Sequence, residues 1–297
     1  MDAGVQPLAR VRAFALSAAA FRRIAIANVV MLILIVGTGA TVRLTGSGLG
    51  CEHWPGCQVH HFEPKSSHSY IEFGNRVFAA ITIVVTLLTW GAAWLVPIVR
   101  KLRWLALVIF VGTLAQAPLG ALTVYSHLNP WLVLSHFLLS IVVLTLGVVL
   151  AVEVRPRSLG VVPKWVRRLG LLVALAAGVL LISGTLATAA GPHPGSTVVR
   201  RLWSFEPAVY WHVRATAVFG VSFAILVAWL AVRRSRHLRG ALAVLAVLAV
   251  QMTIGEVQYR THLPWWLVLA HVTVAATVWA AMCAFVLGLW RPNRISG

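Results

Sequence analysis

A long internal repeat is the feature of this sequence that most constrains its fold. Residues 116–136 read QAPLGALTVYSHLNPWLVLSH and residues 251–271 read QMTIGEVQYRTHLPWWLVLAH, so that a constant offset of 135 residues aligns the two segments. The matched positions include polar residues: Gln116 with Gln251, Gly120 with Gly255, His127 with His262, and His136 with His271. A repeat of this length predicts a tandem duplication, in which each copy builds one half of the fold.

The apolar segments are long enough to cross a membrane. Hydrophobic residues make up 60% of the 297 residues and charged residues only 11%, a composition that excludes an ordinary soluble domain. Runs of membrane-spanning length predict eight helices, at about 24–43, 71–96, 104–124, 131–152, 168–188, 208–230, 240–258 and 265–289. An even number of spans places both ends of the chain on one side.

The net charge of +18 reflects topology rather than nucleic-acid binding, because 18 of the 25 basic residues lie in the two tails and in the loops after spans two, four and six. Basic residues mark the cytoplasmic side of a membrane protein. Both termini are therefore predicted to be cytoplasmic. The first apolar run is of span length and lacks a small-residue cleavage site, so it is predicted to be a retained helix.

Four spans in each half predict a parallel repeat, with the halves related by an axis along the membrane normal. The expected fold is an all-α membrane protein of two tandem four-helix bundles. Weaker matches support the duplication, since VGTGAT at 36–41 resembles SGTLAT at 183–188 and Asn75 aligns with His212 at an offset of 137. The predicted parts are a cytoplasmic tail (1–23), a first bundle (24–152), a cytoplasmic linker (153–167), a second bundle (168–290) and a cytoplasmic tail (291–297).

Three histidines lie at similar depth in the predicted helices. His136 and His271 follow the helix-opening prolines by six and seven residues, which places them about 9–10 Å inside the outer end. His212 lies at a comparable depth in the sixth span. His212 and His271 can serve as the two axial ligands of a haem in the second bundle, or each can be a hydrogen-bonded structural residue.

Seven basic residues fall outside the cytoplasmic set, several of them at the outer helix ends. They can pair with haem propionates or anchor in lipid headgroups. They are Arg43, Lys65, Arg76, Arg200, Arg201, Arg214 and Arg260.

Four motifs together resemble bacterial haem A synthase, a COX15-type membrane family with the same duplicated eight-span layout. They are GTGATVRLTGSGLGCEHWPGC at 37–57, IEFGNR at 71–76, and the repeated segments LNPWLVLSH and LPWWLVLAH. The likeness covers nearly the whole chain. It implies an oxidoreductase of the bacterial cell membrane that oxidises the carbon-8 methyl group of haem O to a formyl group by two successive hydroxylations, which gives haem A for terminal oxidases. It leaves open whether haem O synthase and terminal oxidase assembly proteins bind this chain directly, and whether the chain forms a homo-oligomer.

The resemblance also implies roles for single residues. It places a haem b cofactor between His212 and His271, and the substrate haem in the first bundle with His136 as an iron ligand and Asn75 and Arg76 nearby. The family more often has His where this chain has Asn75. Since an amide is a poor iron ligand, either His136 alone ligates that iron or Asn75 hydrogen-bonds a bound water or a substrate group.

Glu72 is the candidate catalytic residue. It precedes Asn75 by three residues and Arg76 by four, so that the three share a helix face. A carboxylate there can accept protons or position water while the substrate methyl group is oxidised. The alternative is a salt bridge to Arg76 at the interface.

Cys51 and Cys57 lie in the longest outer loop, where an extracytoplasmic compartment permits a disulfide. The resemblance supports this pair, with either a redox or substrate-transfer role or a structural one. Zinc is a further alternative because four histidines are nearby, although their spacing matches no standard ligand pattern; they are His53, His60, His61 and His68. Cys283, in the eighth span, is predicted to be a packing residue.

Two other functions are alternatives for a membrane protein of this kind. A dihaem b-type electron-transfer cytochrome would need the same histidines but not Glu72, and it would leave haem O unchanged. A transporter would need charged groups near the middle of the membrane and helix breaks there. The polar residues of this chain instead gather toward the outer ends of the spans, with Pro118 as the main exception.

Overall fold

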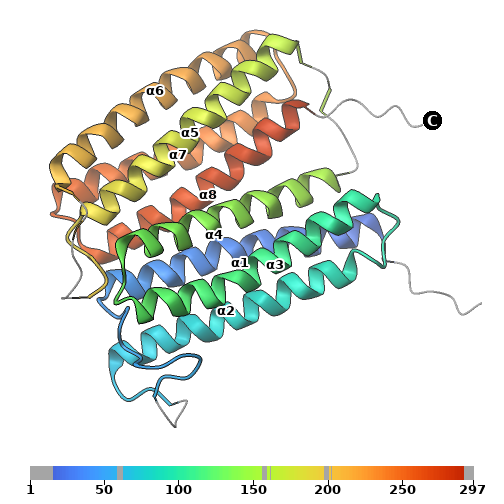
Figure 1. Cartoon of the computed structure of the whole chain (residues 1–297). Coiled ribbons are helices and arrows are strands. Elements are labelled where there is room, and N and C mark those ends of the chain that lie inside the picture. The colour runs from blue at the N-terminus through green and yellow to red at the C-terminus, as the bar shows by residue number, and fades with distance from the viewer. Residues whose placement is uncertain are drawn as a thin grey trace, which may run out of the picture.

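The computed structural model describes residues 16–58, 63–155, 159–160, 162–196, 201 and 203–290. These residues form eight α-helices and no β-strand (Figure 1). Each helix is long and apolar enough to cross a membrane, which confirms the predicted all-α membrane fold. The helices are α1 (Ala18–Leu44), α2 (Ser67–Ala92), α3 (Arg100–Tyr125), α4 (Pro130–Glu153), α5 (Lys164–Ala190), α6 (Phe205–Val232), α7 (Leu238–Arg260) and α8 (Trp265–Trp290).

Polar residues next to the apolar runs define several helix ends. The Ser17 hydroxyl accepts the Ala20 N–H, so that α1 begins at Ala18, six residues before the predicted span. Ser66 and Ser69 form a reciprocal capping box at the start of α2. Asn129 caps α4, whose first residue is Pro130. Each cap satisfies backbone N–H groups that have no partner within the helix.

Threonines bury hydroxyl groups along α2 without leaving them unpaired. Thr82, Thr86 and Thr89 are at most 1% exposed, and each hydroxyl donates to a backbone carbonyl three or four residues earlier at 2.8 Å. Because hydrocarbon offers no hydrogen-bond partners, polar side chains on a membrane helix persist where the helix itself supplies the acceptor.

Helix contacts separate the chain into two groups (Figure 1). Helices α1 to α4 contact one another in sequence, and α1 closes the group against α4. In the second group α5 contacts α6 and α8, α7 contacts α8, and the contact between α6 and α7 is the smallest of these. Helix α8 also packs on α1 and α4, and it is the most buried of the eight. A layout of two tandem bundles requires this grouping, while the domain limits stay a prediction.

The repeat gives the same backbone turn in both halves. His127 and Leu128 follow α3 with φ of 53° and 59°, and His262 and Leu263 follow α7 with φ of 62° and 58°. In each copy the leucine N–H donates to a carbonyl five residues earlier. Such left-handed residues end a helix by pairing its last carbonyls. The repeated His-Leu pair is therefore a helix-ending turn.

Direct hydrogen bonds join the two halves. Arg43, in the last turn of α1, donates from Nε to the His193 carbonyl at 3.1 Å and from Nη2 to the Thr188 carbonyl at 2.9 Å. Deeper in the structure the Trp279 indole N–H donates to the Thr145 hydroxyl at 2.8 Å. Because these bonds link residues more than 130 positions apart, they hold α1 and α4 against the second half.

His237 anchors the linker at the end of the helices opposite the disulfide loop. Its side chain is 2% exposed, and its Nε2 lies 3.2 Å from the Gly160 carbonyl. Burial lowers the pKa of His237 below its usual value, the nearby charge of Arg155 lowers it further, and the bond to Gly160 opposes the change. The imidazole is therefore neutral at neutral pH, and its N–H can donate to the carbonyl.

Arg43→Met should lower the free energy of unfolding by about 1.5–3 kcal/mol, because it leaves two carbonyls without their charged donor. Titration of the detergent-solubilised protein with a denaturing detergent measures this change. Arg214→Met is the matched control, since Arg214 is exposed and stacks on Tyr210 within its own helix. Equal stability of the two variants would contradict the role of Arg43 in joining the halves.

Candidate functional site

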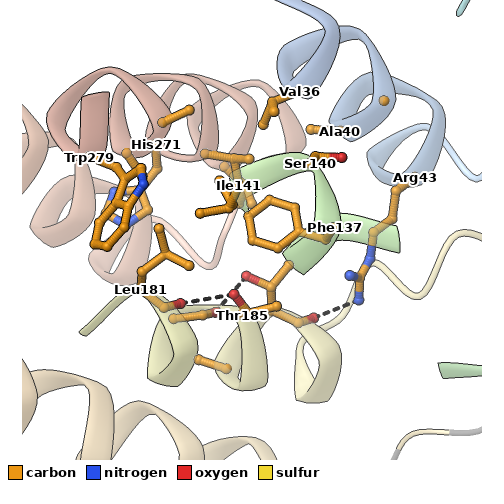
Figure 2. A pocket seen from close by; sticks show the side chains of 18 of the residues that line it. Val36, Ala40, Arg43, Phe137, Ser140, Ile141, Leu181, Thr185, His271 and Trp279 are labelled. Atoms are coloured by element: carbon orange, nitrogen blue, oxygen red, sulfur yellow. Dashed lines mark hydrogen bonds between the residues drawn. The ribbon is translucent and has the colours of Figure 1, made fainter. Parts of the chain in front are cut away.

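A cavity of about 2420 Å³ is lined by residues from all eight helices. This volume exceeds the roughly 300–1,000 Å³ of ordinary small-ligand pockets. Its wall is mainly apolar and includes six of the predicted site residues, namely Glu72, Asn75, Arg76, His136, His212 and His271. Figure 2 shows the region where the halves meet, with Phe137 and Ile141 of α4 on one side and Leu181 of α5 on the other. His271 is labelled beside Trp279 in the same view.

His212 of α6 and His271 of α8 face one another across the second half of this cavity. Their ring centres lie 6.5 Å apart and the ring planes are inclined by 79°. Imidazole nitrogens bind a metal ion at about 2 Å, so two rings on opposite sides of one iron have their centres about 6 Å apart. The observed separation therefore fits the predicted ligation of a haem iron between these two residues.

The first half brings Asn75 of α2 and His136 of α4 to the same cavity. The Asn75 Oδ1 accepts a hydrogen bond from the Thr38 hydroxyl at 2.8 Å. The His136 Nδ1 is buried and has no hydrogen-bond partner. This atom is inaccessible from the cavity, so it says nothing about a group bound there, and the role of His136 as an iron ligand stays a prediction.

Glu72 is almost fully buried, with 4% of the residue exposed. Its Oε1 lies 2.6 Å from the Arg76 Nη2, and its Oε2 accepts the Cys51 N–H at 2.9 Å. The alternative, a salt bridge to Arg76, is therefore present in the structure. The bond from the Cys51 N–H also ties the carboxylate to the outer loop. Since Glu72 still lines the cavity, its catalytic role stays a prediction.

The loop that contains the disulfide is held by Arg76. A disulfide links Cys51 and Cys57, as predicted. The Arg76 Nη1 donates to the carbonyls of His53 at 2.6 Å, Pro55 at 3.3 Å and Gly56. Arg76 thus uses much of its donor capacity within the protein, and its predicted contact with the substrate haem stays untested.

Zinc finds no support in the described part of the loop. There, no three His, Cys, Asp or Glu side chains are grouped as metal ligands. The His68 Nδ1 is instead paired with the Ser47 hydroxyl at 2.9 Å. His60 and His61 lie outside the described residues.

The other outer basic residues have varied surroundings. Arg43 bonds to carbonyls of the second half, the Arg214 guanidinium lies 3.7 Å from the centre of the Tyr210 ring, and Arg260 pairs with Glu256 on the surface. Arg200 lies outside the described residues. Pairing of this group with haem propionates stays a prediction.

Sequence reasoning missed the groups that contact His212 and His271, the two predicted haem ligands. The Ser183 hydroxyl lies 3.1 Å from the His212 Nδ1, and the Gln251 Nε2 lies 3.1–3.2 Å from both ring nitrogens of His271. Both residues belong to repeated segments, which was the available signal. A sequence repeat does not reveal which side chains of neighbouring helices touch, however, so it could not assign these contacts. Cys283 is buried and free, in agreement with a packing residue.

Comparisons with known proteins identify relatives of this chain. The sequence profile of the COX15-CtaA family, described as cytochrome oxidase assembly protein, matches residues 22–69 and 59–283. A heme A synthase of Geobacillus kaustophilus is 34% identical over 133 residues, which cover 42% of this chain and 40% of the relative.

Two further heme A synthases give matches of similar extent. The Bacillus pumilus protein is 34% identical over 120 residues, or 39% of each chain, and the Shewanella oneidensis protein is 29% identical over 150 residues, or 44% of this chain and 45% of the relative. The chain thus spans less than half the length of the relatives that it matches.

Arg76→Ala should accelerate reduction of the Cys51–Cys57 disulfide by a membrane-impermeant reductant by roughly tenfold or more, because the loop loses its charged hydrogen-bond donor. Alkylation of the released thiols, followed by mass measurement, gives the rate. Arg260→Ala is the matched control, because it removes an ion pair of the same helical spacing on the surface. An unchanged rate in Arg76→Ala would show that the loop is held by other contacts.

Proposed function

Because the chain belongs to the COX15-CtaA family of cytochrome oxidase assembly proteins, we propose that it is a haem A synthase, an oxidoreductase that converts haem O to haem A. The observation that carries this proposal is the cavity of about 2420 Å³, whose wall includes His136 from one half and His212 with His271 from the other. The named relatives support the same activity. The eight apolar helices make the chain a multi-pass membrane protein.

The second half is proposed to hold a haem b cofactor. His212 and His271 would supply its two axial ligands, in keeping with the 6.5 Å between their ring centres. When bound, this haem supplies one-electron redox chemistry. The surrounding residues exclude water, because Phe219, Phe223 and Met282 are at most 2% exposed and lie deeper on the same wall.

The first half is proposed to bind haem O, with His136 as the protein ligand and Asn75 and Arg76 as further contacts. In two successive hydroxylations of the carbon-8 methyl group, water would supply each oxygen atom and an external acceptor would take two electrons at each step, with two protons released. The product would be a hydrated aldehyde, which loses water to leave the formyl group. Glu72 would accept a proton or orient water beside that methyl group. The burial of its carboxylate and its place on the cavity wall support this role.

The orientation follows from the charge distribution. We propose that both termini are cytoplasmic and that the disulfide loop is outside, since the basic residues gather at the opposite end of the helices. Haem O synthase and terminal oxidase assembly proteins are candidate partners.

His212→Ala and His271→Ala should each remove a low-spin b-type haem spectrum from the purified protein, because each removes one of two axial bonds. Spectra of the reduced and oxidised protein, with pyridine extraction to count haem B, measure the loss. His262→Ala is the control, since His262 lies in the turn after α7. An unchanged low-spin spectrum in both variants would refute the assignment.

Glu72→Gln should stop conversion of haem O to haem A while leaving the second-half haem intact, since it removes the charge with almost no change of shape. Extraction and mass measurement of haems from cells supplied with haem O give the conversion. Glu256→Gln breaks the exposed ion pair of the same spacing and should leave conversion unchanged. Haem A production at the normal rate by Glu72→Gln would contradict the catalytic role of Glu72. If the unmodified protein makes no haem A, the dihaem cytochrome becomes the favoured function.

A further inference from the structure

The surroundings of the His212 ring distinguish its two nitrogens. The Ser183 hydroxyl, on α5, lies 2.8 Å from the Leu180 carbonyl and 3.1 Å from the His212 Nδ1. A hydroxyl has one proton, and the carbonyl can only accept it. Ser183 therefore gives its proton to Leu180 and accepts the N–H at Nδ1 of His212. This arrangement leaves a lone pair on Nε2, the form in which a neutral imidazole binds a metal.

The next residue of α5 fixes the position of the same ring. A Cβ atom on Gly184 would lie 2.8 Å from the His212 Cε1 and 3.3 Å from its Nδ1. Real side chains do not approach so closely, so any larger residue here displaces the imidazole. Glycine in the middle of a helix lowers helix stability by about 1 kcal/mol relative to alanine. Its presence at this point is explained by the close approach of the ring.

The other histidines give an internal comparison. A Cβ on Gly255 of α7 would lie 2.9 Å from the His271 Cε1, whereas a Cβ on Gly120, its counterpart in the first half, would lie 3.5 Å from the His136 Cε1. Each of the three rings thus lies against a glycine of a neighbouring helix. The contact is tight for the two ligands proposed for haem b and ordinary for His136.

We propose that Ser183 and Gly184 are positioning residues that hold His212 with its Nε2 toward the iron of haem b. The inference rests on the proposed function, because it takes His212 as a haem ligand. A hydrogen bond from the distal N–H of a metal-bound imidazole fixes the ring and increases its basicity. Ser183 would thus set the electron donation of this ligand, and Gly184 would set its position.

The two residues have separable effects. Ser183→Ala removes the acceptor with little change of shape, so the haem should stay low-spin while its midpoint potential rises, because a less basic ligand stabilises the ferric state less. Ser183→Thr retains a hydroxyl and should restore the potential. Gly184→Ala should convert the low-spin signal to a high-spin one, because the displaced ring no longer completes the axial pair.

The experiment uses the full chain, purified with its haem. Electron paramagnetic resonance of the oxidised protein and a spectroscopic redox titration give spin state and potential without any assay of turnover. Gly178→Ala on α5 is the control, since Gly178 is not among the cavity-lining residues and a Cβ there meets Trp279 at an ordinary 3.7 Å. It should keep the original spectrum and potential.

The outcomes separate this inference from the function on which it rests. A low-spin signal that survives His212→Ala refutes the haem site itself. A signal that His212→Ala removes, but that Gly184→Ala and Ser183→Ala leave unchanged in spin state and potential, overturns only the positioning role. If Gly184→Ala does not accumulate in the membrane, Ser183→Ala decides alone: a raised potential that Ser183→Thr reverses supports the inference, and an unchanged one overturns it.

Discussion

The lack of hydrogen-bond partners in hydrocarbon is the constraint on which the rest of this structure depends. Buried threonine hydroxyls pair with carbonyls of their own helices, and Arg43 reaches carbonyls of the opposite half. The exceptions include polar atoms beside the predicted haem ligands: the His136 Nδ1 and the Oε1 atoms of Gln116 and Gln251 are buried without partners. Other buried side-chain atoms are also without partners, among them both polar atoms of Asn28, which lies away from the cavity, so unpaired atoms alone do not locate a bound group.

Duplication supplied the scaffold, and later differences between the halves separate their proposed roles. At the offset of 137 that aligns Asn75 with His212, Glu72 and Arg76 align with Val209 and Val213. The cysteines of the outer loop likewise occur only in the first half. The second half therefore keeps two imidazoles in an apolar setting, which suits a permanently bound redox group. The first half adds a buried carboxylate, which pairs with Arg76, and a disulfide loop, which suits chemistry on a substrate.

The sequence predicted the fold because the membrane constrains every span alike: its thickness sets the length of the apolar run, and basic loops lie on the cytoplasmic side. It predicted the pairing of His212 with His271 because their positions within the sixth and eighth spans place them at comparable depth. It did not reveal that Ser183 and Gly184 contact His212, that Glu72 accepts the Cys51 N–H, or that Arg43 bridges the halves. These contacts depend on the rotation of one helix against another, which neither periodicity nor composition encodes.

The first helix of each half presents a hydroxyl to the second, but with opposite polarity. The Ser183 hydroxyl lies closer to the Leu180 carbonyl (2.8 Å) than to the His212 Nδ1 (3.1 Å), so it accepts from the imidazole. The Thr38 hydroxyl lies closer to the Asn75 Oδ1 (2.8 Å) than to the Ile35 carbonyl (3.2 Å), so it donates to the amide. Because the Asn75 Oδ1 accepts the Thr38 hydroxyl, the N–H groups of the same amide stay available as donors. An N–H group cannot ligate iron, but it can donate a hydrogen bond to an oxygen atom. On the proposed function, the cavity beside Asn75 would thus hold an oxygen-bearing molecule rather than a second protein ligand for the iron. An Asn at this position, in place of a second histidine, would leave one coordination position of that iron open for chemistry.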